Sequence, residues 1–335
     1  MAADGVEPLL AAAHRWKRAR TSGLGADEAR QEAEPATGSC SIPAPTRVHF
    51  PSGLSVWCHA PPEALHIHEE IYTRIAYMPA DAGLQLPATP GALVVDAGAN
   101  IGMFALWVAN RAQRCQVLAI EPATPSFKLL QRNVEDHGLG QRIACVQAAL
   151  GEAHGSAELT WYSAMPGNAT LFPSAKEHEV RIAFRPERHE AMLRSPGTMI
   201  ETCEVSTLSQ ILRARGHSDS VPLAADCAGS SVSASQVMQQ CGARPIALLK
   251  IDVEGGEVST LKGIEAADWQ RIEQVVVETH SVESRLAVLQ LLRRHYKVVG
   301  EVADDELEAC GLDRKVVYAR SPAAEPPPNP DAQEP

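Results

Sequence analysis

The sequence is poor in features that mark whole classes of protein. Aromatic residues make up only 4% of its 335 positions, too few for the stacking platforms that bind single-stranded nucleic acids. The 30 basic residues are outnumbered by 41 acidic ones, and the net charge of −11 opposes broad binding to nucleic acid or anionic membranes. No apolar run approaches the roughly 20 residues of a membrane-spanning helix, and Asp4 and Glu7 interrupt the region where a secretory signal would lie. We therefore expect a cytoplasmic protein, with a weak organelle-type signal at residues 15–20 as the alternative.

Several well-known site motifs are also missing. The sequence contains no C-x-x-C pair, Walker A loop, H-E-x-x-H or G-x-S-x-G, so the metal, phosphate-loop and serine-hydrolase chemistries that they support are not indicated. The eight cysteines are scattered, and without a secretion signal we interpret them as reduced thiols. Residues 66–70 hold two histidines and two acids, but histidines two positions apart do not share a helix face. We expect no metal ion.

The chain divides into a globular middle and two tails of biased composition. Residues 1–45 are rich in alanine and are predicted to be a poorly ordered extension, and the Pro-, Ala- and Glu-rich residues 320–335 a disordered tail. Residues 46–319 are predicted to form one domain. Its rhythm breaks at two insertions, near residues 163–200, where prolines and charges alternate, and near residues 216–245, which are rich in serine, alanine and glycine.

Short apolar strands alternate with helices along this domain. A hairpin at residues 47–59 and a helix at 62–78 come first, and strands are also expected at 157–162 and 202–205. The main strands are expected at residues 93–95, 116–120, 143–148, 246–251, 275–278, 297–299 and 316–318, and the helices at 103–111, 125–137, 208–213, 257–261 and 284–295. Because β-α-β order implies a parallel sheet with right-handed crossovers, we predict an α/β fold with a mostly parallel seven-stranded sheet and helices on both faces.

A glycine-rich turn follows the first main strand and reads D-A-G-A-N-I-G from Asp96 to Gly102. Glycines there permit a tight turn and let a ligand approach the backbone, and the helix that follows offers free N–H groups. The spacing is not the G-x-G-x-x-G of dinucleotide binders, and the carboxylate of Asp96 suits a cationic or hydroxyl-bearing ligand better than a phosphate. The alternative is a purely structural βα turn.

An acidic residue, Glu121, ends the second main strand 25 residues after Asp96. A carboxylate at this position can accept hydrogen bonds from both hydroxyls of a ribose. The alternative interpretation is an exposed acid at a strand end. Taken together, the glycine-rich turn and Glu121 fit a nucleoside ligand without phosphate, namely S-adenosylmethionine.

Two further strands end in acids. Asp252 follows the strand at 246–251 and is expected to point into the crevice at the carboxyl edge of the sheet, with Glu254 facing the same way if the chain stays extended. We interpret Glu257 as a solvated acid in the first turn of the next helix. His280 ends the strand at 275–278 and is a candidate general base, because the ordinary pKa of histidine lies near neutrality; a structural histidine is the alternative.

The pattern of these motifs resembles the FkbM family of S-adenosylmethionine-dependent methyltransferases over residues 47–300. The resemblance rests on Val95–Gly102, Ile120–Pro122, Asn133, Ala149–Gly151, Leu249–Gly255 and Val277–His280. It implies a Rossmann-like class I methyltransferase fold. It also implies that Asp96, Gly98, Asn100 and Gly102 line the methionine and ribose parts of the cofactor, that Glu121 holds the ribose diol, that Gln147 and Ala148 flank the adenine, and that Asp252 lies beside the reacting methyl. The neighbouring Ala99 and Pro122 are counted with the cofactor-binding residues.

The resulting hypothesis is a methyltransferase that modifies a hydroxyl of a small molecule, sugar or natural-product-like acceptor. Its candidate bases, in order, are His280, Asp252 and Glu254. A non-catalytic cofactor-binding or scaffold protein with an inherited fold is the main alternative, since a fold does not guarantee activity. A nicotinamide-dependent dehydrogenase is disfavoured by the missing dinucleotide fingerprint, and a nucleic-acid methyltransferase by the acidic composition.

Overall fold

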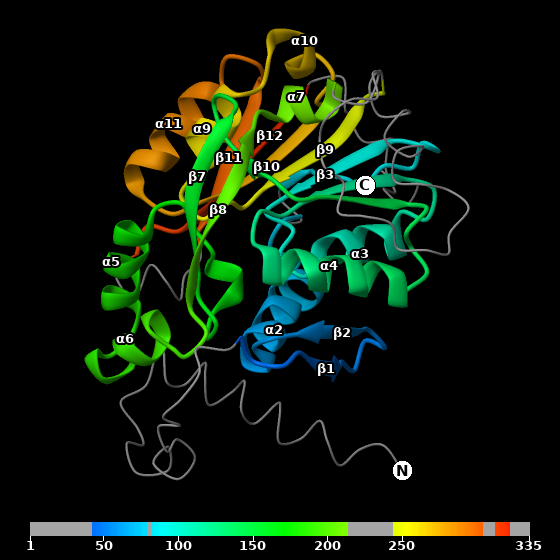
Figure 1. Ribbon diagram of the computed structural model, residues 1–335. Coiled ribbons are helices and arrows are strands. Elements are labelled where there is room, and N and C mark those ends of the chain that lie inside the picture. The colour runs from blue at the N-terminus through cyan, green and yellow to red at the C-terminus, as the bar shows by residue number, and fades with distance from the viewer. Residues whose placement is uncertain (1–41, 79–81, 214–243, 304–311, 322–335) are drawn as a thin grey trace, which may run out of the picture.

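The computed structural model describes residues 42–78, 82–213, 244–303 and 312–321, and its centre is a seven-stranded sheet (Figure 1). In spatial order the strands are β11 (Val298–Ala303), β12 (Lys315–Arg320), β10 (Gln274–Thr279), β9 (Ile246–Ile251), β3 (Leu93–Ala97), β4 (Gln116–Ile120) and β5 (Ile143–Val146). Strands β10, β9, β3, β4 and β5 are parallel, whereas β12 runs antiparallel to both β10 and β11. The predicted α/β fold with a mostly parallel sheet is confirmed.

The direction of strand order changes beside β3. Strands β4 and β5 follow it on one side, and β9 and β10 lie on the other. In open α/β sheets such a switch point opens a crevice at the carboxyl ends of the strands, where ligands bind. The pairing register also places Asp96 of β3 directly opposite Lys250 of β9. The fold therefore brings the glycine-rich turn after β3 to the end of β9.

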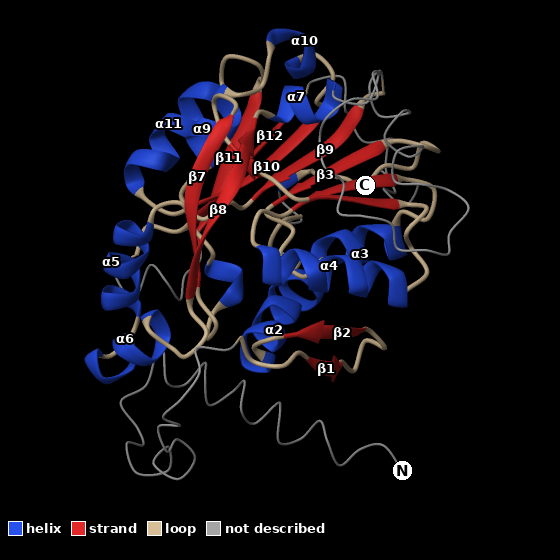
Figure 2. Ribbon diagram, viewed as in Figure 1, coloured by secondary structure: helices blue, strands red, loops and turns tan. Residues whose placement is uncertain are grey.

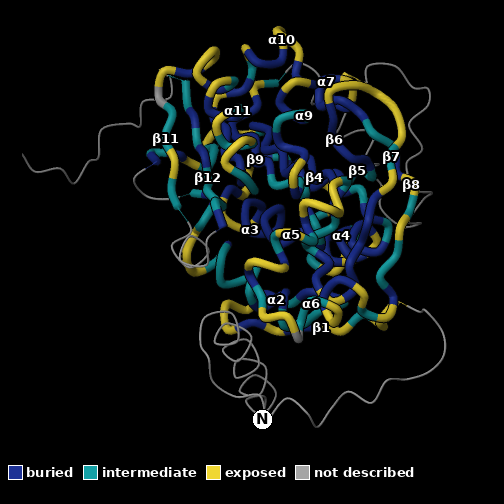
Figure 3. Tube along the Cα trace, turned by 90° about the vertical axis from the view of Figure 1, so that its left-hand side faces the viewer, coloured by how far each residue is buried: buried dark blue, intermediate teal, exposed yellow. Residues whose placement is uncertain are grey.

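Alternate residues of the strands pack into two different cores. Val94 contributes to the core formed with the helices α3 and α4, whereas its neighbour Val95 contributes to the core formed with α7, α9, α10 and α11, as the period of two in a strand requires. The helices are α3 (Met103–Arg111), α4 (Thr124–Asp136), α7 (Leu208–Arg213), α9 (Glu257–Lys262), α10 (Ala266–Trp269) and α11 (Val282–Leu292). Figure 2 shows helices on both faces of the sheet, and Figure 3 shows the buried positions concentrated between the layers.

The predicted hairpin is present as β1 (Thr46–His49) and β2 (Ser55–Cys58), and it packs beside α4. The side chain of Asn133 ties the two together: its amide nitrogen donates to the carbonyl of Trp57 at 3.1 Å and to that of Ile101 at 2.9 Å, and its oxygen accepts from the Trp57 N–H at 2.7 Å. Because Ile101 belongs to the glycine-rich turn, this buried asparagine links the hairpin to the edge of the site.

The helix expected at residues 62–78 is confirmed as far as Arg74, and the prediction is wrong for residues 75–78. The α-helix α2 spans Pro61–His68 and widens into a π-helix, η2, over Glu69–Arg74. It ends because Ile75 adopts a left-handed backbone (φ 53°) and the N–H of Ala76 donates to the carbonyl of Glu70. This turn directs the chain inward, so Tyr77 is buried instead of lying on a helix surface.

A small second sheet carries the segment that interrupts the sequence rhythm. Its strands are β6 (Ala149–Leu150), β8 (Met199–Ser206) and β7 (Gly155–Trp161), in that spatial order. Between β7 and β8 lie a short 3-10 turn, η4 (Pro166–Asn168), and two helices, α5 (Pro173–Ala183) and α6 (Pro186–Leu193). Two of the prolines that suggested an irregular insertion at 163–200, Pro173 and Pro186, are the first residues of these helices. Proline is favoured there because a backbone N–H in the first turn of a helix has no carbonyl partner within the helix.

Within the described residues, no helix combines the length and apolar character needed to cross a membrane. The four described cysteines, Cys58, Cys115, Cys145 and Cys203, are free. The predictions made for residues 1–41, for most of the segment 216–245 and for residues 322–335 lie outside the described residues.

Candidate active site

A cavity of about 130 Å³ opens at the carboxyl ends of β3, β4, β9 and β10. One part of its wall is apolar and includes Pro122, Ala148, Leu150 and Leu159. The other part is rich in charge, and its acids and bases come from α2, η2, α5, the strand ends and the segment before β12: Glu63, Glu70, Glu121, Lys176, Glu179, Lys250, Asp252, Glu254, Glu278 and Arg314. The cavity therefore offers both apolar and charged side chains to a bound molecule.

The glycine-rich turn forms the floor of this cavity. Gly98 has a left-handed backbone (φ 77°), and a Cβ atom there would lie 1.7 Å from the carbonyl oxygen of Asp252. Only glycine permits this approach between the ends of β3 and β9. Asn100 is also left-handed (φ 49°), a conformation that asparagine tolerates better than most residues. Gly102 (φ 92°) then starts α3, and its missing side chain makes room for Leu130.

The carboxylate of Glu121 is fixed by two backbone donors. The N–H of Asn100 donates to its Oε2 at 2.8 Å and the N–H of Ala123 to its Oε1 at 2.8 Å. Burial raises the pKa of Glu121 to about 7, although these donors oppose the shift. The buried Oδ1 atom of Asn100 has no hydrogen-bond partner among the described residues. The turn and the strand end thus present two oriented polar groups to the cavity.

Lys250 holds the ends of β3 and β9 together from beneath. Its ammonium lies 3.2 Å from Oδ1 of Asp96, 2.9 Å from the carbonyl oxygen of Gly98 and 3.6 Å from Oδ2 of Asp252. Asp96 is fully buried and Lys250 is 3% exposed. Burial raises the pKa of Asp96, while the neighbouring Lys250 opposes the shift. The positive charge of Lys250 in the apolar strand β9 is thereby balanced by the negative charge of Asp96 in β3.

In the cavity wall, the carboxyl groups of Asp252 and Glu278 both contact the hydroxyl of Tyr77. The hydroxyl of Tyr77 lies 2.9 Å from Oδ2 of Asp252 and 2.7 Å from Oε2 of Glu278. The other carboxylate oxygen of Asp252, Oδ1, is buried without a hydrogen-bond partner in the described part of the chain, and Arg314 forms an ion pair with Oε1 of Glu278. Burial raises the pKa of Glu278 to about 7; Arg314 opposes this shift and Asp252 adds to it.

Glu254 is the centre of a buried ion cluster. Its carboxylate lies 2.6 Å from Nζ of Lys176 on α5, 3.0 Å from Nε2 of His280 and 3.4 Å from Nη2 of Arg314. Burial would raise the pKa of Glu254, but these cations hold it well below the ordinary value. The residue is not extended (φ 51°), so it does not continue the alternation from Asp252. Its carboxylate is committed to binding cations of the protein.

His280 lies behind this cluster and is not part of the cavity wall. Its Nδ1 is 2.8 Å from Oε1 of Glu257, and its Nε2 faces Glu254. Burial lowers the pKa of His280, but the two carboxylates outweigh it and raise the pKa well above 6.5. Both ring nitrogens are engaged by protein groups, Nδ1 by Glu257 and Nε2 by Glu254 and, at 3.1 Å, by Nη2 of Arg314, and the ring does not line the cavity, so the geometry does not support His280 as general base. Glu257 is fully buried and bonded to His280 and Ser284, so its interpretation as a solvated acid is wrong.

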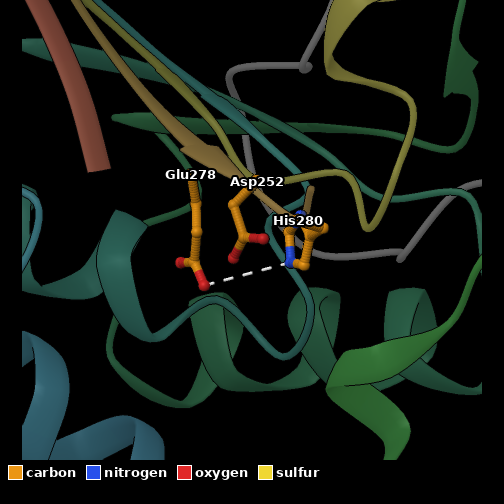
Figure 4. Close-up of side chains that lie close together, drawn as sticks. All are labelled: Asp252, Glu278 and His280. Carbon is orange, nitrogen blue, oxygen red and sulfur yellow. Dashed lines mark ion pairs between the residues drawn. The ribbon is translucent and has the colours of Figure 1, made fainter. Parts of the chain in front are cut away.

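Asp252, Glu278 and His280 gather at the ends of β9 and β10, with one potential ligand atom of each lying within 4.8 Å of the others (Figure 4). Such spacing is compatible with a metal ion. Each member, however, already contacts protein groups: the Tyr77 hydroxyl lies within hydrogen-bond distance of both acids, Arg314 pairs with Glu278, and the histidine bridges two carboxylates. The charges of these three side chains are therefore paired with other side chains of the protein.

Of the predicted cofactor-binding residues, six line the cavity: Gly98, Ala99, Asn100, Glu121, Pro122 and Ala148. Asp96, Gly102 and Gln147 do not line it. Asp96 is engaged by Lys250, and Gln147 turns its amide to the Pro122 carbonyl at 3.3 Å and the Thr124 hydroxyl at 2.8 Å. Of the predicted catalytic residues, Asp252 and Glu254 line the cavity.

Several charged or polar residues of the site were not singled out from the sequence, and four of them, Lys250, Tyr77, Lys176 and Arg314, form its central contacts. The sequence does point to Lys250, because it stands two positions before Asp252 and, in an extended chain, its side chain lies on the same face of the sheet as that of Asp252. It does not point to Tyr77, Lys176 or Arg314, because each reaches the cavity from an element whose position relative to the sheet is set by tertiary packing.

Comparison with known proteins places the chain in a family. The methyltransferase FkbM domain matches residues 96–299, more than half of the chain. Methyltransferase sdnD of Sordaria araneosa is 33% identical over 227 residues, which are 68% of this chain and 78% of that protein. The 31-O-demethyl-FK506 methyltransferase FkbM of Streptomyces tacrolimicus is 32% identical over 277 residues, 82% of this chain and 97% of that protein. A crystal structure of methyltransferase FkbM from Methylobacillus flagellatus KT aligns with 75% of this chain and 47% of its own, at 17% identity and a TM-score of 0.41. The chain belongs to the FkbM family of methyltransferases.

Proposed function

We propose that the protein is an S-adenosylmethionine-dependent methyltransferase that modifies a hydroxyl group of a small molecule. The observation that carries this proposal is the oriented pair at the floor of the cavity. Glu121 is held by two backbone N–H groups, and beside it the side-chain oxygen of Asn100 is buried without a partner among the described residues. Buried polar atoms are rarely left unsatisfied, so an unpartnered one in a cavity wall indicates a bound group.

The residues present fit this cofactor. Glu121 keeps free lone pairs for the two hydroxyls of a ribose. The apolar lining residues Pro122, Ala148 and Leu150 would suit the adenine ring. The bare backbone at Gly98 and the negative charge of Asp252 would hold the sulfonium group. When bound, S-adenosylmethionine supplies a methyl carbon that forms a bond to the acceptor oxygen as its bond to sulfur breaks, the electron pair remaining on sulfur and the hydroxyl proton leaving to a base.

Asp252 is the base that the geometry favours. It lines the cavity, and its Oδ1 is buried without a hydrogen-bond partner in the described residues, whereas Glu254 is bonded to Lys176 and both ring nitrogens of His280 face carboxylates. A general base must lie within hydrogen-bond reach of the proton that it takes. Binding of an acceptor hydroxyl to Oδ1 would satisfy that atom and orient the oxygen for attack, which is where positioning contributes most to rate.

Two further facts favour an oxygen acceptor on a small molecule. One relative is named for an O-demethyl substrate, 31-O-demethyl-FK506. The net charge of −11 and the acids around the cavity oppose an anionic acceptor such as nucleic acid. The second candidate function, a cofactor-binding protein without turnover, shares the same cavity and differs only in transferring no methyl group.

The experiment is transfer of a radiolabelled methyl group from S-adenosylmethionine to a panel of hydroxylated small molecules, with matched amines and an oligonucleotide for comparison. We expect label in a hydroxylated acceptor, and a loss of at least about hundredfold in kcat for Asp252→Asn. Asp136→Asn, which alters a partly exposed carboxylate on α4 that bonds Trp57, is the matched control and should retain full activity. Cofactor binding without transfer to any member of the panel would favour the non-catalytic function.

A further inference from the structure

The hydroxyl of Tyr77 lies within hydrogen-bond distance of two carboxylate oxygens but has only one hydrogen to donate. It lies between Oδ2 of Asp252 at 2.9 Å and Oε2 of Glu278 at 2.7 Å, and all three side chains line the cavity. A phenol carries one hydrogen, so it can donate to only one of the two oxygens at a time. Burial and the two carboxylates raise the pKa of Tyr77 well above 10, so the phenol keeps that hydrogen near neutrality.

The second oxygen contact therefore needs another proton. If both carboxyl groups are ionised, one carboxylate oxygen faces the phenol oxygen with no hydrogen between them, which is unfavourable at this spacing. If one carboxyl group is protonated, it donates to the phenol oxygen and the phenol donates to the other carboxylate, and every contact is satisfied. The arrangement of the three groups thus favours uptake of one proton.

We infer that Asp252, Tyr77 and Glu278 form one proton-accepting unit, in which Tyr77 is a positioning residue that lets the two carboxyl groups share the proton removed from the acceptor hydroxyl. The inference deepens the proposed function and rests on it. It assigns Glu278 a place in proton transfer and gives Tyr77 a role that sequence motifs do not indicate.

The proton balance of the step is simple. The O–H bond of the acceptor breaks, its electron pair stays on the acceptor oxygen, and the proton bonds to Oδ1 of Asp252. Rotation of that carboxyl group about its Cβ–Cγ bond turns the proton toward the phenol oxygen, and Tyr77 then donates to Oε2 of Glu278. The negative charge ends on Glu278, where Arg314 forms an ion pair with the opposite oxygen.

Charged groups on every neighbouring element bear on this unit. They are Asp96 of β3, Lys250 of β9, His280 at the end of β10, Glu70 of η2 and Arg314 before β12. The cations favour the ionised form of the unit and the acids favour its protonated form. Burial raises the pKa of Glu278 to about 7; Arg314 opposes this shift and Asp252 adds to it.

The test compares Tyr77→Phe with Glu278→Gln. Loss of the phenol removes the acceptor that stabilises the protonated carboxyl group, so the acid limb of the kcat/KM–pH profile should move down by about one pH unit, whereas loss of a phenol that only donated to ionised carboxylates would move it up. An amide at position 278 removes a charge and donates to the phenol, so the limb should move down by about one unit and kcat should fall with the weaker base. Tyr72→Phe, which removes a hydroxyl that donates to the Met103 carbonyl, is the matched control and should leave the profile unchanged.

A second readout needs neither cofactor nor acceptor. Infrared titration of the unliganded protein should reveal a buried carboxyl group that titrates near pH 7. This titration should move down in both Tyr77→Phe and Glu278→Gln. A titration in Tyr77→Phe at the wild-type pH, or above it, would overturn the inference. If the protein transfers no methyl group while the infrared shifts occur as expected, the proposed function fails, and the shared proton remains as a property of the unit.

Discussion

Substitution of Gly98 by alanine tests the contact on which the site is built. The added Cβ atom would lie 1.7 Å from the carbonyl oxygen of Asp252, and the shortest ordinary contact is 3.4 Å, so the two backbones must separate by about 3.4 − 1.7 = 1.7 Å. The substitution also places alanine in a left-handed conformation (φ 77°). Both the stability of the fold and the position of Asp252 should therefore suffer.

Two other glycines separate these effects. Gly138 has a similar backbone (φ 66°) with no atom within 4 Å of an added Cβ, and Gly140 has neither the conformation nor a neighbour. We expect Gly140→Ala to change the free energy of unfolding by less than about 0.5 kcal/mol, and Gly138→Ala to lower it by about 1–2 kcal/mol. Gly98→Ala adds overpacking of about 1–3 kcal/mol and should reach about 2–5 kcal/mol.

The assay is urea unfolding followed by circular dichroism, together with kcat of the folded fraction. Because a misplacement of about 1 Å can cost hundredfold in rate, Gly98→Ala should lose at least about that factor, whereas Gly138→Ala should keep wild-type kcat. Equal destabilisation of Gly98→Ala and Gly138→Ala, or unchanged kcat in Gly98→Ala, would refute the argument that the bare backbone at Gly98 positions Asp252.

Two further predictions concern buried charges. In the proposed site, ribose hydroxyls donate to the ionised form of Glu121, whose pKa burial raises to about 7, so the affinity for S-adenosylmethionine should fall as pH drops below 7. The Glu121→Gln variant should bind the cofactor about 10- to 100-fold more weakly and without this pH dependence, which calorimetry can measure. The ion cluster of Glu254 and His280 should stabilise the fold fully only between about pH 4.5 and 6.5. Its acid has a lowered pKa, so that stability is lost as pH falls, and its imidazole has a raised pKa, so stability is also lost as pH rises through that value.

The contrary results are equally definite. If a Glu121→Gln variant binds the cofactor as tightly as the wild type, the carboxylate of Glu121 does not bind the ribose. For the ion cluster, unfolding free energies of wild type and His280→Gln are compared from pH 6 to pH 10 by urea denaturation. The wild type should lose its advantage over the variant as pH rises, and a constant difference between the two would show that His280 is not protonated in the folded protein.

Much of the sheet could be predicted because its signals are local. Buried parallel strands such as β3 and β9 are short apolar runs between glycine- or acid-containing turns, and their helices follow at regular spacing. The segment 163–200 was harder to interpret because Pro173 and Pro186, which usually interrupt structure, here occupy helix starts. The π-helix at 69–74 has no sequence signature of its own, so the inward turn to Tyr77 could not be anticipated.

The site was predictable where it depends on strand ends and not where it depends on packing. Glu121 and Asp252 end parallel strands, and parallel strands end at one edge of the sheet, so their convergence follows from topology. The role of His280 could not be predicted in the same way, because it depends on contacts with Glu254 and Glu257, whose side chains lie against it only in the folded chain. Arg314 reaches the site from beside an antiparallel strand far along the sequence, and no nearby motif indicates it.

The central claim is that the cavity at the end of β3 binds S-adenosylmethionine. Calorimetric titration of the wild-type protein with S-adenosylmethionine and S-adenosylhomocysteine, with NAD as the control, measures this directly. We predict one site per chain for the first two, with micromolar affinity, and no binding of NAD. Binding of NAD, or no binding of either S-adenosyl compound, would contradict the account and leave the glycine-rich turn as a structural element.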